Sequence, residues 1–437
     1  MPPPPLDAQV TERTTCRVCR SSALVPVMDL GRQCIAGAFP ERASSHPAPE
    51  RYPLELVRCD RESRADACGL IQLRHTIRGD LLYDSYWYRS GINRTMTRNL
   101  HEIATQASAL VDGLQPADLV VDIGCNDGTL LDGYQAIAPS GVDYLGIDPS
   151  DVTRYAIDKG YDVVQDFFSS ETFRQRHPDR QAKIVTSIAM FYDLEDPSAF
   201  VTHIAASLAD NGVWVSEFSY MPTMLKMNSF DTICHEHLEY YSLAVIERLF
   251  QSAGLQVLNA ELNDVNGGSI RLFAGKAGNN KLLPEHDRGL ETMRAAELDV
   301  GLDTAQPYVD FVRRSEHVRR DLLELLRSLK NDGRRVHIYG ASTKGNTLLQ
   351  YCGIDNSLVE CAADRNPDKW KSETIGTHIP IISEEESRGL LPDYYLVLPW
   401  HFLDEMIDRE REFFERGGKF IVPLPDVRIV EGVPRGR

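Results

Sequence analysis

The sequence predicts an α/β protein whose central part is a parallel, doubly wound sheet. Between about residues 116 and 275, short apolar runs of the β type alternate with helical patterns. That order of strand, helix and strand is typical of parallel sheets, because each crossover helix returns the chain to the same edge. A cysteine-rich segment precedes this region, and a second alternation follows it. We therefore expect three domains, at 1–77, 78–278 and 279–437.

Runs of apolar residues place the individual elements. In the central part the expected strands are 119–123, 144–147, 184–188 and 213–216, and a helix at 96–110 precedes them. In the last part the expected strands are 335–339, 358–363, 394–398 and 419–423, after helices at 285–296 and 308–329. The mixed charges of these two helices indicate solvated faces. The last part is therefore expected to be a second, smaller α/β domain.

The composition limits the class of protein. Hydrophobic residues make up 42% of the 437 residues, and the formal net charge is −17. Such an acidic chain is poorly suited to broad binding of nucleic acids or anionic membranes, since both are negatively charged. There is no apolar run of about 18 residues that would indicate a membrane span. The proline-rich start lacks the pattern of a secretory signal, so the cytoplasm is the expected compartment.

Five of the nine cysteines lie in the first 70 residues, a pattern that indicates a metal site. Cys16-x-x-Cys19 is a short chelating loop, and Cys59 and Cys68 supply a second pair. Four thiolates satisfy a tetrahedral zinc ion, and in a reducing compartment such crowding favours metal over disulfides. The spacing of the second pair is long, and Cys34 is the alternative for one ligand. A site closed by four thiolates is expected to be structural.

The first strand of the central part ends in a glycine turn that fits a nucleoside cofactor. Asp122 and Gly124 lead through Asn126 to Gly128, after which a helix begins. Glycines permit the tight turn and let a ligand approach the backbone. The turn is neither a G-x-G-x-x-G fingerprint nor a P-loop. It resembles the first motif of the class I S-adenosylmethionine-dependent methyltransferases.

Two later positions complete the expected cofactor site. Asp148 ends the second strand, where its carboxylate can accept both ribose hydroxyls, as the acidic residue does in dinucleotide-binding folds. After the third strand, Asp166 is placed for the adenine amino group and Phe167 for stacking on the ring. The glycine turn, Asp148 and the Asp166–Phe167 pair follow one another in this order, and together they predict S-adenosylmethionine binding.

The densest cluster of reactive side chains lies at 231–241, after the strand end at 217–220, where α/β folds place their sites. Glu236 and His237 form a candidate acid–base pair, because an imidazole titrates near neutrality and a carboxylate can hold its tautomer. A metal site built from His235 and His237 is the alternative.

Two further turns are candidates for substrate contact. Asn266 and Gly267 belong to a polar turn that could close over a substrate or could simply join two strands. Ser342 and Lys344 belong to a strand-to-helix turn at 339–346. Backbone amides, a helix N-terminus and a lysine make a natural phosphate cradle, so this turn predicts anion binding.

In this order, the motifs resemble those of the nucleotide-sugar C-methyltransferases over essentially the whole chain. The resemblance implies an N-terminal zinc-binding domain, a class I methyltransferase domain and a C-terminal Rossmann-like domain that helps hold the nucleotide sugar. It implies methyl transfer from S-adenosylmethionine to a sugar carbon next to a keto group. That carbon is typically C-3 of a 4-keto-6-deoxy sugar carried on dTDP or another nucleotide.

The resemblance also implies roles for single residues. The family's base corresponds to His237, with Glu236 orienting or charging it. A family tyrosine that contacts the sugar corresponds to Tyr88, with Tyr86 as the near alternative. Cys234 stands where some members have a tyrosine two residues before the glutamate, a difference that bears on which sugar is used.

Other functions remain as alternatives at the level of sequence. One is O- or N-methylation of a sugar or small metabolite, which needs only a base and the same cofactor. Another is an RNA-modifying or RNA-binding protein, since zinc knuckles also occur beside methyltransferase folds; the acidic balance and the lack of a basic, aromatic stripe weigh against it. A third is a non-catalytic scaffold.

Overall fold

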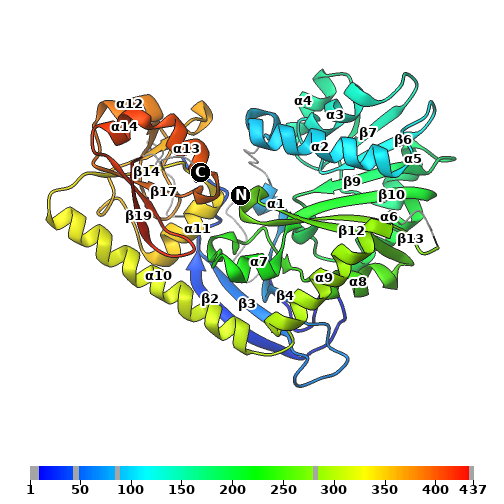
Figure 1. Ribbon diagram of the computed structural model, residues 1–437, viewed down its shortest axis with the longest axis horizontal. Helices are drawn as coiled ribbons and strands as arrows, with labels where there is room; N and C mark the ends of the chain where they lie inside the picture. The colour runs from blue at the N-terminus through cyan, green and yellow to red at the C-terminus, as the bar shows by residue number, and fades with distance from the viewer. Residues whose placement is uncertain (1–8, 43–48, 84–88, 279–283, 433–437) are drawn as a thin grey trace.

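The computed structural model describes residues 9–42, 49–83, 89–278 and 284–432. Figure 1 shows three parts: an N-terminal sheet, a central α/β part coloured cyan to green, and a C-terminal part coloured yellow to red. The N-terminal strands β2, β3 and β4 lie below and between the other two. In the part of the chain that the structure describes, every helix is too short or too polar to cross a membrane.

The N-terminal part is built from short antiparallel strands. These are β1 (Val10–Glu12), β2 (Leu24–Gln33), β3 (Tyr52–Cys59), β4 (Ile71–Leu73) and β5 (His75–Ile77), followed by helix α1 (Gly79–Tyr83). The main sheet has the order β11-β4-β3-β2. Its edge strand β11 (Glu239–Tyr240) comes from the reactive cluster far along the chain, with Glu239 opposite Gln72. The cluster is therefore held by the N-terminal sheet.

The central part is a seven-stranded sheet of the order β12-β13-β10-β9-β6-β7-β8. Its strands are β6 (Leu119–Ile123), β7 (Asp143–Ile147), β8 (Asp162–Val164), β9 (Ala182–Ile188), β10 (Leu208–Ser219), β12 (Leu255–Asn263) and β13 (Ser269–Lys276). All four expected strands are confirmed, and the last two strands form an antiparallel hairpin. The strand order reverses beside β6, and ligands of open α/β sheets bind at such a point.

Helices cover this sheet. They are α2 (Arg94–Leu110), α3 (Thr129–Ile137), α4 (Arg154–Asp158), α5 (Ser170–Arg176), α6 (Pro197–Ser207), α8 (Leu243–Ser252) and α9 (Pro284–Val300). Helix α7 (Met221–Lys226) contributes instead to the apolar core that contains Phe230. The expected helix at 96–110 is confirmed as α2, whose N-cap Asn93 accepts from the amides of Thr95 and Met96. The helix expected at 285–296 is confirmed as α9.

The C-terminal part is a six-stranded sheet of the order β16-β15-β14-β17-β18-β19. Its elements are α10 (Gln306–Asn331), β14 (Val336–Tyr339), α11 (Thr343–Cys352), β15 (Ala362–Asp364), β16 (Ile381–Ser383), α12 (Glu384–Gly389), β17 (Tyr394–Val397), α13 (Leu403–Arg409), α14 (Arg411–Glu415), β18 (Lys419–Val422) and β19 (Arg428–Glu431). The strand expected at 358–363 begins later, because the amides of Leu358 and Val359 bond back to the Asp355 carbonyl in a turn.

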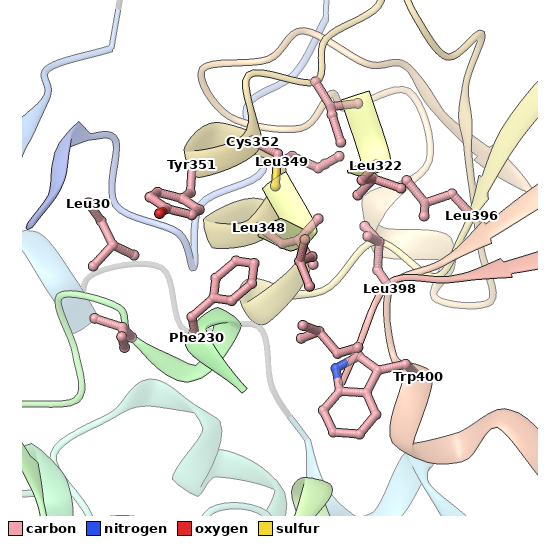
Figure 2. Packing of buried hydrophobic residues seen from close by; sticks show 14 of the residues in the cluster. Leu30, Phe230, Leu322, Leu348, Leu349, Tyr351, Cys352, Leu396, Leu398 and Trp400 are labelled. Atoms are coloured by element: carbon pink, nitrogen blue, oxygen red, sulfur yellow. The ribbon is translucent and has the colours of Figure 1, made fainter. Parts of the chain in front are cut away.

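One apolar core joins the three parts. It contains Leu30 from β2, Phe230 from the central part and Tyr351 from α11, all buried. Figure 2 shows Phe230 beside Tyr351 and Leu348, and the rings of Phe230 and Tyr351 have centroids 5.2 Å apart. Because interfaces between domains are usually more polar than this, the shared core fixes how the parts sit relative to one another.

A buried ion pair ties helix α2 to the central sheet. Arg271 Nε on β13 lies 2.7 Å from Glu217 Oε2 on β10, and each side chain is 3% exposed. Asn99 of α2 donates to Glu217 Oε1 at 2.6 Å and accepts from Arg271 at 2.6 Å. Every charge in this group is therefore compensated by hydrogen bonds.

We expect Arg271→Met to destabilise the protein by about 3–5 kcal/mol, because Glu217 would be left buried without its counter-ion. Urea denaturation measures the effect. Lys276→Met is the matched control on the same strand, since its partner Asp210 is 92% exposed and the loss there should stay within about 0.5 kcal/mol. Equal losses for the two variants would contradict the role of the buried pair.

Candidate active site

The four predicted cysteine ligands come together. The Sγ atoms of Cys16, Cys19, Cys59 and Cys68 all lie within 4.8 Å of one another, with two of the pairs 3.4 Å apart. Tetrahedral zinc with Zn–S bonds of about 2.3 Å places its sulfurs roughly 3.8 Å apart, so this set fits the ion and leaves no open position. Cys34 as a replacement ligand is wrong, because Cys34 is held instead at Gln350 of α11 by its backbone amide.

A loop runs from the N-terminal sheet to the reactive cluster. Asn346 Nδ2 of α11 donates to the Ala36 carbonyl at 2.8 Å, and the Gly37 amide donates to Glu236 Oε1 at 3.2 Å. A Cβ at Gly37 would lie 2.8 Å from the same oxygen, so a larger residue here would displace the Glu236 carboxylate. The zinc-bearing part therefore reaches the predicted acid–base pair through its backbone.

The glycine turn after β6 has the backbone that the sequence predicts. Gly124, Asn126 and Gly128 have φ angles of 74°, 51° and 76°, in the left-handed region. A Cβ at Gly128 would lie 3.0 Å from that of Ala156, so the turn also packs closely against α4. Asp122 is buried beneath the turn, and burial raises its pKa to about 7. Asp122 therefore supports the turn from below.

The other predicted cofactor residues lie at the ends of the neighbouring strands. Asp148, after β7, accepts from the Asn126 amide at 2.9 Å, which joins the acid to the turn. Asp166 and Phe167 follow β8, and the Phe167 ring is 65% exposed and open for stacking. The three strand ends are adjacent in the sheet. The structure thus brings the turn, Asp148 and the Asp166–Phe167 pair together.

The segment before α2 is also attached to the turn. Asn126 Oδ1 accepts from the Ser90 amide at 3.0 Å, and Asp127 Oδ2 accepts from the Gly91 amide at 2.9 Å. The predicted sugar contacts Tyr86 and Tyr88 lie outside the described residues.

His237 is oriented by a backbone carbonyl. Its Nδ1 lies 2.8 Å from the Thr232 oxygen, and because a carbonyl only accepts, Nδ1 carries the proton. The other nitrogen, Nε2, keeps its lone pair and has no hydrogen-bond partner among the described residues. Burial and the nearby charge of Lys344 lower the pKa of His237 to about 4, so the ring is neutral at pH 7. The Tyr192 ring packs against it at 4.3 Å.

Glu236 does not orient His237, contrary to the prediction. The two residues lie in a turn closed by the His237 amide and the Cys234 carbonyl, and Glu236 points to Gly37 instead. Burial raises the pKa of Glu236, and its Oε2 has no hydrogen-bond partner. The predicted substrate contact of Cys234 is also corrected, because Cys234 is fully buried and lies beside Glu236.

The two histidines of the cluster have separate partners. His235 is buried, its Nε2 lies 3.4 Å from the Tyr52 carbonyl, and its ring packs edge-on against Tyr52. His237 binds the Thr232 carbonyl. They therefore do not converge on one metal ion.

The polar turn at Asn266 has the strand-joining role that the sequence allowed, and its contact with a substrate stays a prediction. It joins β12 and β13, and it also contacts the C-terminal part, where Lys344 Nζ donates to the Asn266 carbonyl at 2.6 Å. Gly267 faces Trp400, whose Nε1 donates to Asp231 Oδ2 at 2.9 Å. Glu236, His237, Asn266, Lys344 and His401 are here called the domain junction.

The predicted phosphate cradle at Ser342 and Lys344 is partly used within the protein. Ser342 Oγ accepts from the Gly345 amide and so caps α11, while the Ala341 amide donates to Asp364 Oδ2 at 2.8 Å. Lys344 points into the domain junction, and anion binding at this turn stays a prediction.

Several residues around the domain junction carry no local signal in the sequence. Thr232 and Gly37 act through backbone atoms, and Trp400 and His401 belong to a distant part of the chain. Thr232 lies inside the cluster at 231–241, whereas Gly37, Trp400 and His401 lie outside every motif that the sequence singled out, so only the folded chain brings them to this cluster.

A switch point occupied by a glycine turn, with acids at the next two strand ends, defines an S-adenosylmethionine-dependent methyltransferase of class I. Family models match along the chain: a zinc binding domain at 16–83, a methyltransferase domain at 88–260 and a C-methyltransferase C-terminal domain at 264–425.

A curated relative extends the match to the whole chain. C-methyltransferase NovU of Streptomyces niveus is 34% identical over 420 residues, which cover 95% of this chain and 96% of NovU. The chain belongs to this C-methyltransferase family, and it uses S-adenosylmethionine and binds zinc.

Solved structures share parts of the fold. Magnesium protoporphyrin IX methyltransferase of Synechocystis PCC 6803, with bound SAM, has 16% identity and a TM-score of 0.31, covering 41% of this chain and 79% of its own. The N-methyltransferase NodS of Bradyrhizobium japonicum WM9 has 12% identity and a TM-score of 0.32, covering 42% and 98%.

We expect Cys68→Ser to lower the zinc content and the thermal stability together, because ligand binding by the folded site contributes directly to folding. Metal analysis and calorimetry of the purified protein measure both. Cys361→Ser is the control, since Cys361 is a buried thiol of the C-terminal part and should retain the metal. Unchanged zinc in the Cys68 variant would contradict the four-cysteine site.

The contribution of the buried histidines to stability should fall as the pH drops from about 6.5 to 4. Burial lowers the pKa of His235 and of His237 to about 4, whereas unfolded histidine titrates near 6.5. In this window each of these histidines binds more protons in the unfolded chain, so their contribution is complete above about 6.5 and declines toward 4. Urea titrations across this range should show a shallower slope for His235→Asn. The exposed His378→Asn should keep the wild-type slope, and equal slopes for all three proteins would contradict the assignment.

Proposed function

We propose that this protein methylates a carbon next to a keto group in a nucleotide-linked deoxysugar, with His237 as the base. The observation that carries the proposal is the state of His237: a neutral ring whose Nδ1 is held by a carbonyl and whose Nε2 is open. Family membership supports carbon as the acceptor. A carbon acceptor has no lone pair, so a proton must be removed from it first, and an adjacent ketone makes that proton acidic.

The chemistry follows from these groups. His237 Nε2 takes the proton from the carbon, the C–H electrons form a C=C bond, and the keto oxygen becomes an enolate oxygen. When bound, S-adenosylmethionine supplies an electrophilic methyl group. The enolate carbon bonds to that methyl carbon as the S–C bond breaks toward sulfur, and the ketone re-forms. His237 then releases its proton to water.

The cofactor roles remain part of the proposal. Asp148 is proposed to bind the ribose hydroxyls, and Asp166 and Phe167 the adenine. Support comes from their position at adjacent strand ends beside the switch point, and from the exposed ring of Phe167. Gly124 and Gly128 let the methionine portion approach the backbone.

The substrate roles and the domain limits are also proposals. The nucleotide sugar is proposed to lie at the domain junction, with Tyr86 and Tyr88 contacting the sugar and Asn266 and Gly267 beside it. The functional division is proposed at 1–77, 78–278 and 279–437, with β11 as a segment that crosses the first limit.

A panel of 4-keto nucleotide sugars, with mass spectrometry of the products, tests the substrate class. A mass gain of one methyl group on the sugar carbon supports the proposal. Transfer only to oxygen or nitrogen would favour O- or N-methylation instead. Transfer to none of the sugars in the panel would reject the proposed substrate class.

We expect His237→Gln to lower the turnover by about 100-fold or more, the usual contribution of a positioned general base. Deuterium exchange at the carbon next to the ketone, without cofactor, should fall in parallel, while S-adenosylmethionine affinity should stay unchanged. Mass spectrometry and calorimetry measure these quantities.

Asp148→Asn is the matched variant for this experiment. It should weaken cofactor binding and methyl transfer yet keep the deuterium exchange, because proton removal does not involve Asp148. Near-normal turnover of the His237 variant would show that another group is the base.

A further inference from the structure

Lys344 is a lysine of the C-terminal part that reaches into the domain junction. It lies in the first turn of α11, and its Nζ donates to the Asn266 carbonyl of the central part at 2.6 Å. An ammonium group has three N–H donors. The other two have no hydrogen-bond partner among the described residues. Lys344 therefore has donors to offer to a ligand.

The charge of Lys344 is also without a close counter-ion. Among the described residues no carboxylate oxygen lies within 4.0 Å of its Nζ. The strongest attraction on its charge comes from Asp231, one of whose oxygens accepts from the Trp400 indole while the other has no hydrogen-bond partner among the described residues. Charges surrounded by protein are normally paired. The Lys344 ammonium group is therefore suited to bind an anionic group of a ligand.

The groups that face Lys344 show where that anion would lie. They are Asp231, Cys234, His237 and His401, and the positive charge of Lys344 lowers the pKa of both histidines. A series of contacts also connects Lys344 to Asp231. The Asn266 carbonyl accepts from Lys344, and the next residue, Gly267, packs on Trp400. The Trp400 indole in turn donates to Asp231. The residue after Asp231 is Thr232, whose carbonyl orients His237.

A phosphate of the nucleotide is a poor match for this lysine. The amides of Ala341 and Gly345 in the same turn are already bonded, to Asp364 and Ser342 respectively. The Asp364 carboxylate would repel a phosphate placed there. Two amides of the turn are thus used within the protein, and the Lys344 ammonium group is held at the Asn266 carbonyl of the central part.

We propose that Lys344 binds the keto oxygen of the substrate and stabilises the enolate that forms when His237 removes the neighbouring proton. This inference rests on the proposed function. In that step the C–H bond breaks, the proton goes to His237 Nε2, and the negative charge goes to the oxygen. His237 then becomes a cation near the Lys344 ammonium, and the enolate oxygen is the anion that offsets both. Donors placed where such charge develops contribute about 100- to 1,000-fold.

Lys344→Met tests the proposal, because it keeps the length of the side chain and removes the charge. We expect deuterium exchange next to the ketone and methyl transfer to fall together by about 100-fold or more. The dissociation constants of free nucleoside diphosphate and of S-adenosylmethionine should change by less than about threefold, since neither carries the keto oxygen. A phosphate-binding lysine would give the reverse, with weaker nucleotide binding and normal turnover, and that result would overturn the proposal.

The pH profile of the exchange is a second readout. Loss of the ammonium should raise the pKa of His237, because Lys344 is one of the two causes that lower it. The acidic limb of the profile should therefore move to higher pH in Lys344→Met. The other groups around the pair, Asp231, Cys234 and His401, are unchanged in this variant. An unmoved limb together with normal exchange would count against the proposal.

Two further variants separate charge from structure. Lys369→Met is the matched control, since Lys369 is a largely buried lysine of the same part whose Nζ donates to the Ala341 carbonyl at 2.7 Å. It should keep exchange and turnover. Lys344→Gln keeps an amide that can donate to Asn266 and should lose exchange as Lys344→Met does, and retained exchange in a folded Gln variant would overturn the proposal.

Experiments on the wild-type protein distinguish a failure of the proposed function from a failure of the proposed role of Lys344. If the wild type neither exchanges nor methylates any keto sugar of the panel, the proposed function fails. If the wild type does both and the neutral Lys344 variants do so equally well, only the role of Lys344 fails.

Discussion

The segment from Phe230 to Tyr240 is held by all three parts of the chain, and the position of His237 depends on it. Asp231 accepts a hydrogen bond from Trp400 of the C-terminal part, and Glu236 accepts one from Gly37 of the N-terminal part. Tyr240 pairs with β4 of the zinc-bearing sheet. Thr232, between these anchors, supplies the carbonyl that fixes the tautomer of His237. A shift of any one part would therefore change the orientation of this ring.

This arrangement explains why a methyltransferase carries a structural zinc ion far from its chemistry. The four cysteines sit near the ends of strands β3 and β4 and in the loop before β2, and three of them belong to an apolar core shared with the central sheet. A small sheet buries little surface, so a metal ion makes a large difference to its stability. The stabilised sheet receives β11 along one edge and carries the loop with Gly37. The zinc ion thus acts through backbone geometry.

The sequence predicted the parts of the site whose residues lie close together along the chain. Buried parallel strands such as β6 and β9 read as continuous apolar runs, and a strand end with two glycines or an acid is recognisable within a few residues. Contacts between distant segments have no such signature, so Gly37 and Trp400 were not predicted, and Thr232 was not predicted because it acts through its backbone carbonyl. The orientation of Glu236 was predicted wrongly, because neighbours in a turn point to different partners. The sequence of the turn at Lys344 is the same whether the ammonium group faces solvent or the domain junction, so the direction of this side chain could not be predicted.

The charges of the domain junction can be followed through the proposed reaction. At rest the site holds the Lys344 cation beside a neutral His237, and the bound sulfonium adds a second positive charge. This field opposes protonation of His237 by solvent and favours an anion on the substrate, so the base stays available until the enolate forms. Methyl transfer then cancels the enolate against the sulfonium. Lys344 and the protonated His237 are left facing each other, and their repulsion favours loss of the proton to water. The charge that promotes enolate formation therefore also restores the base.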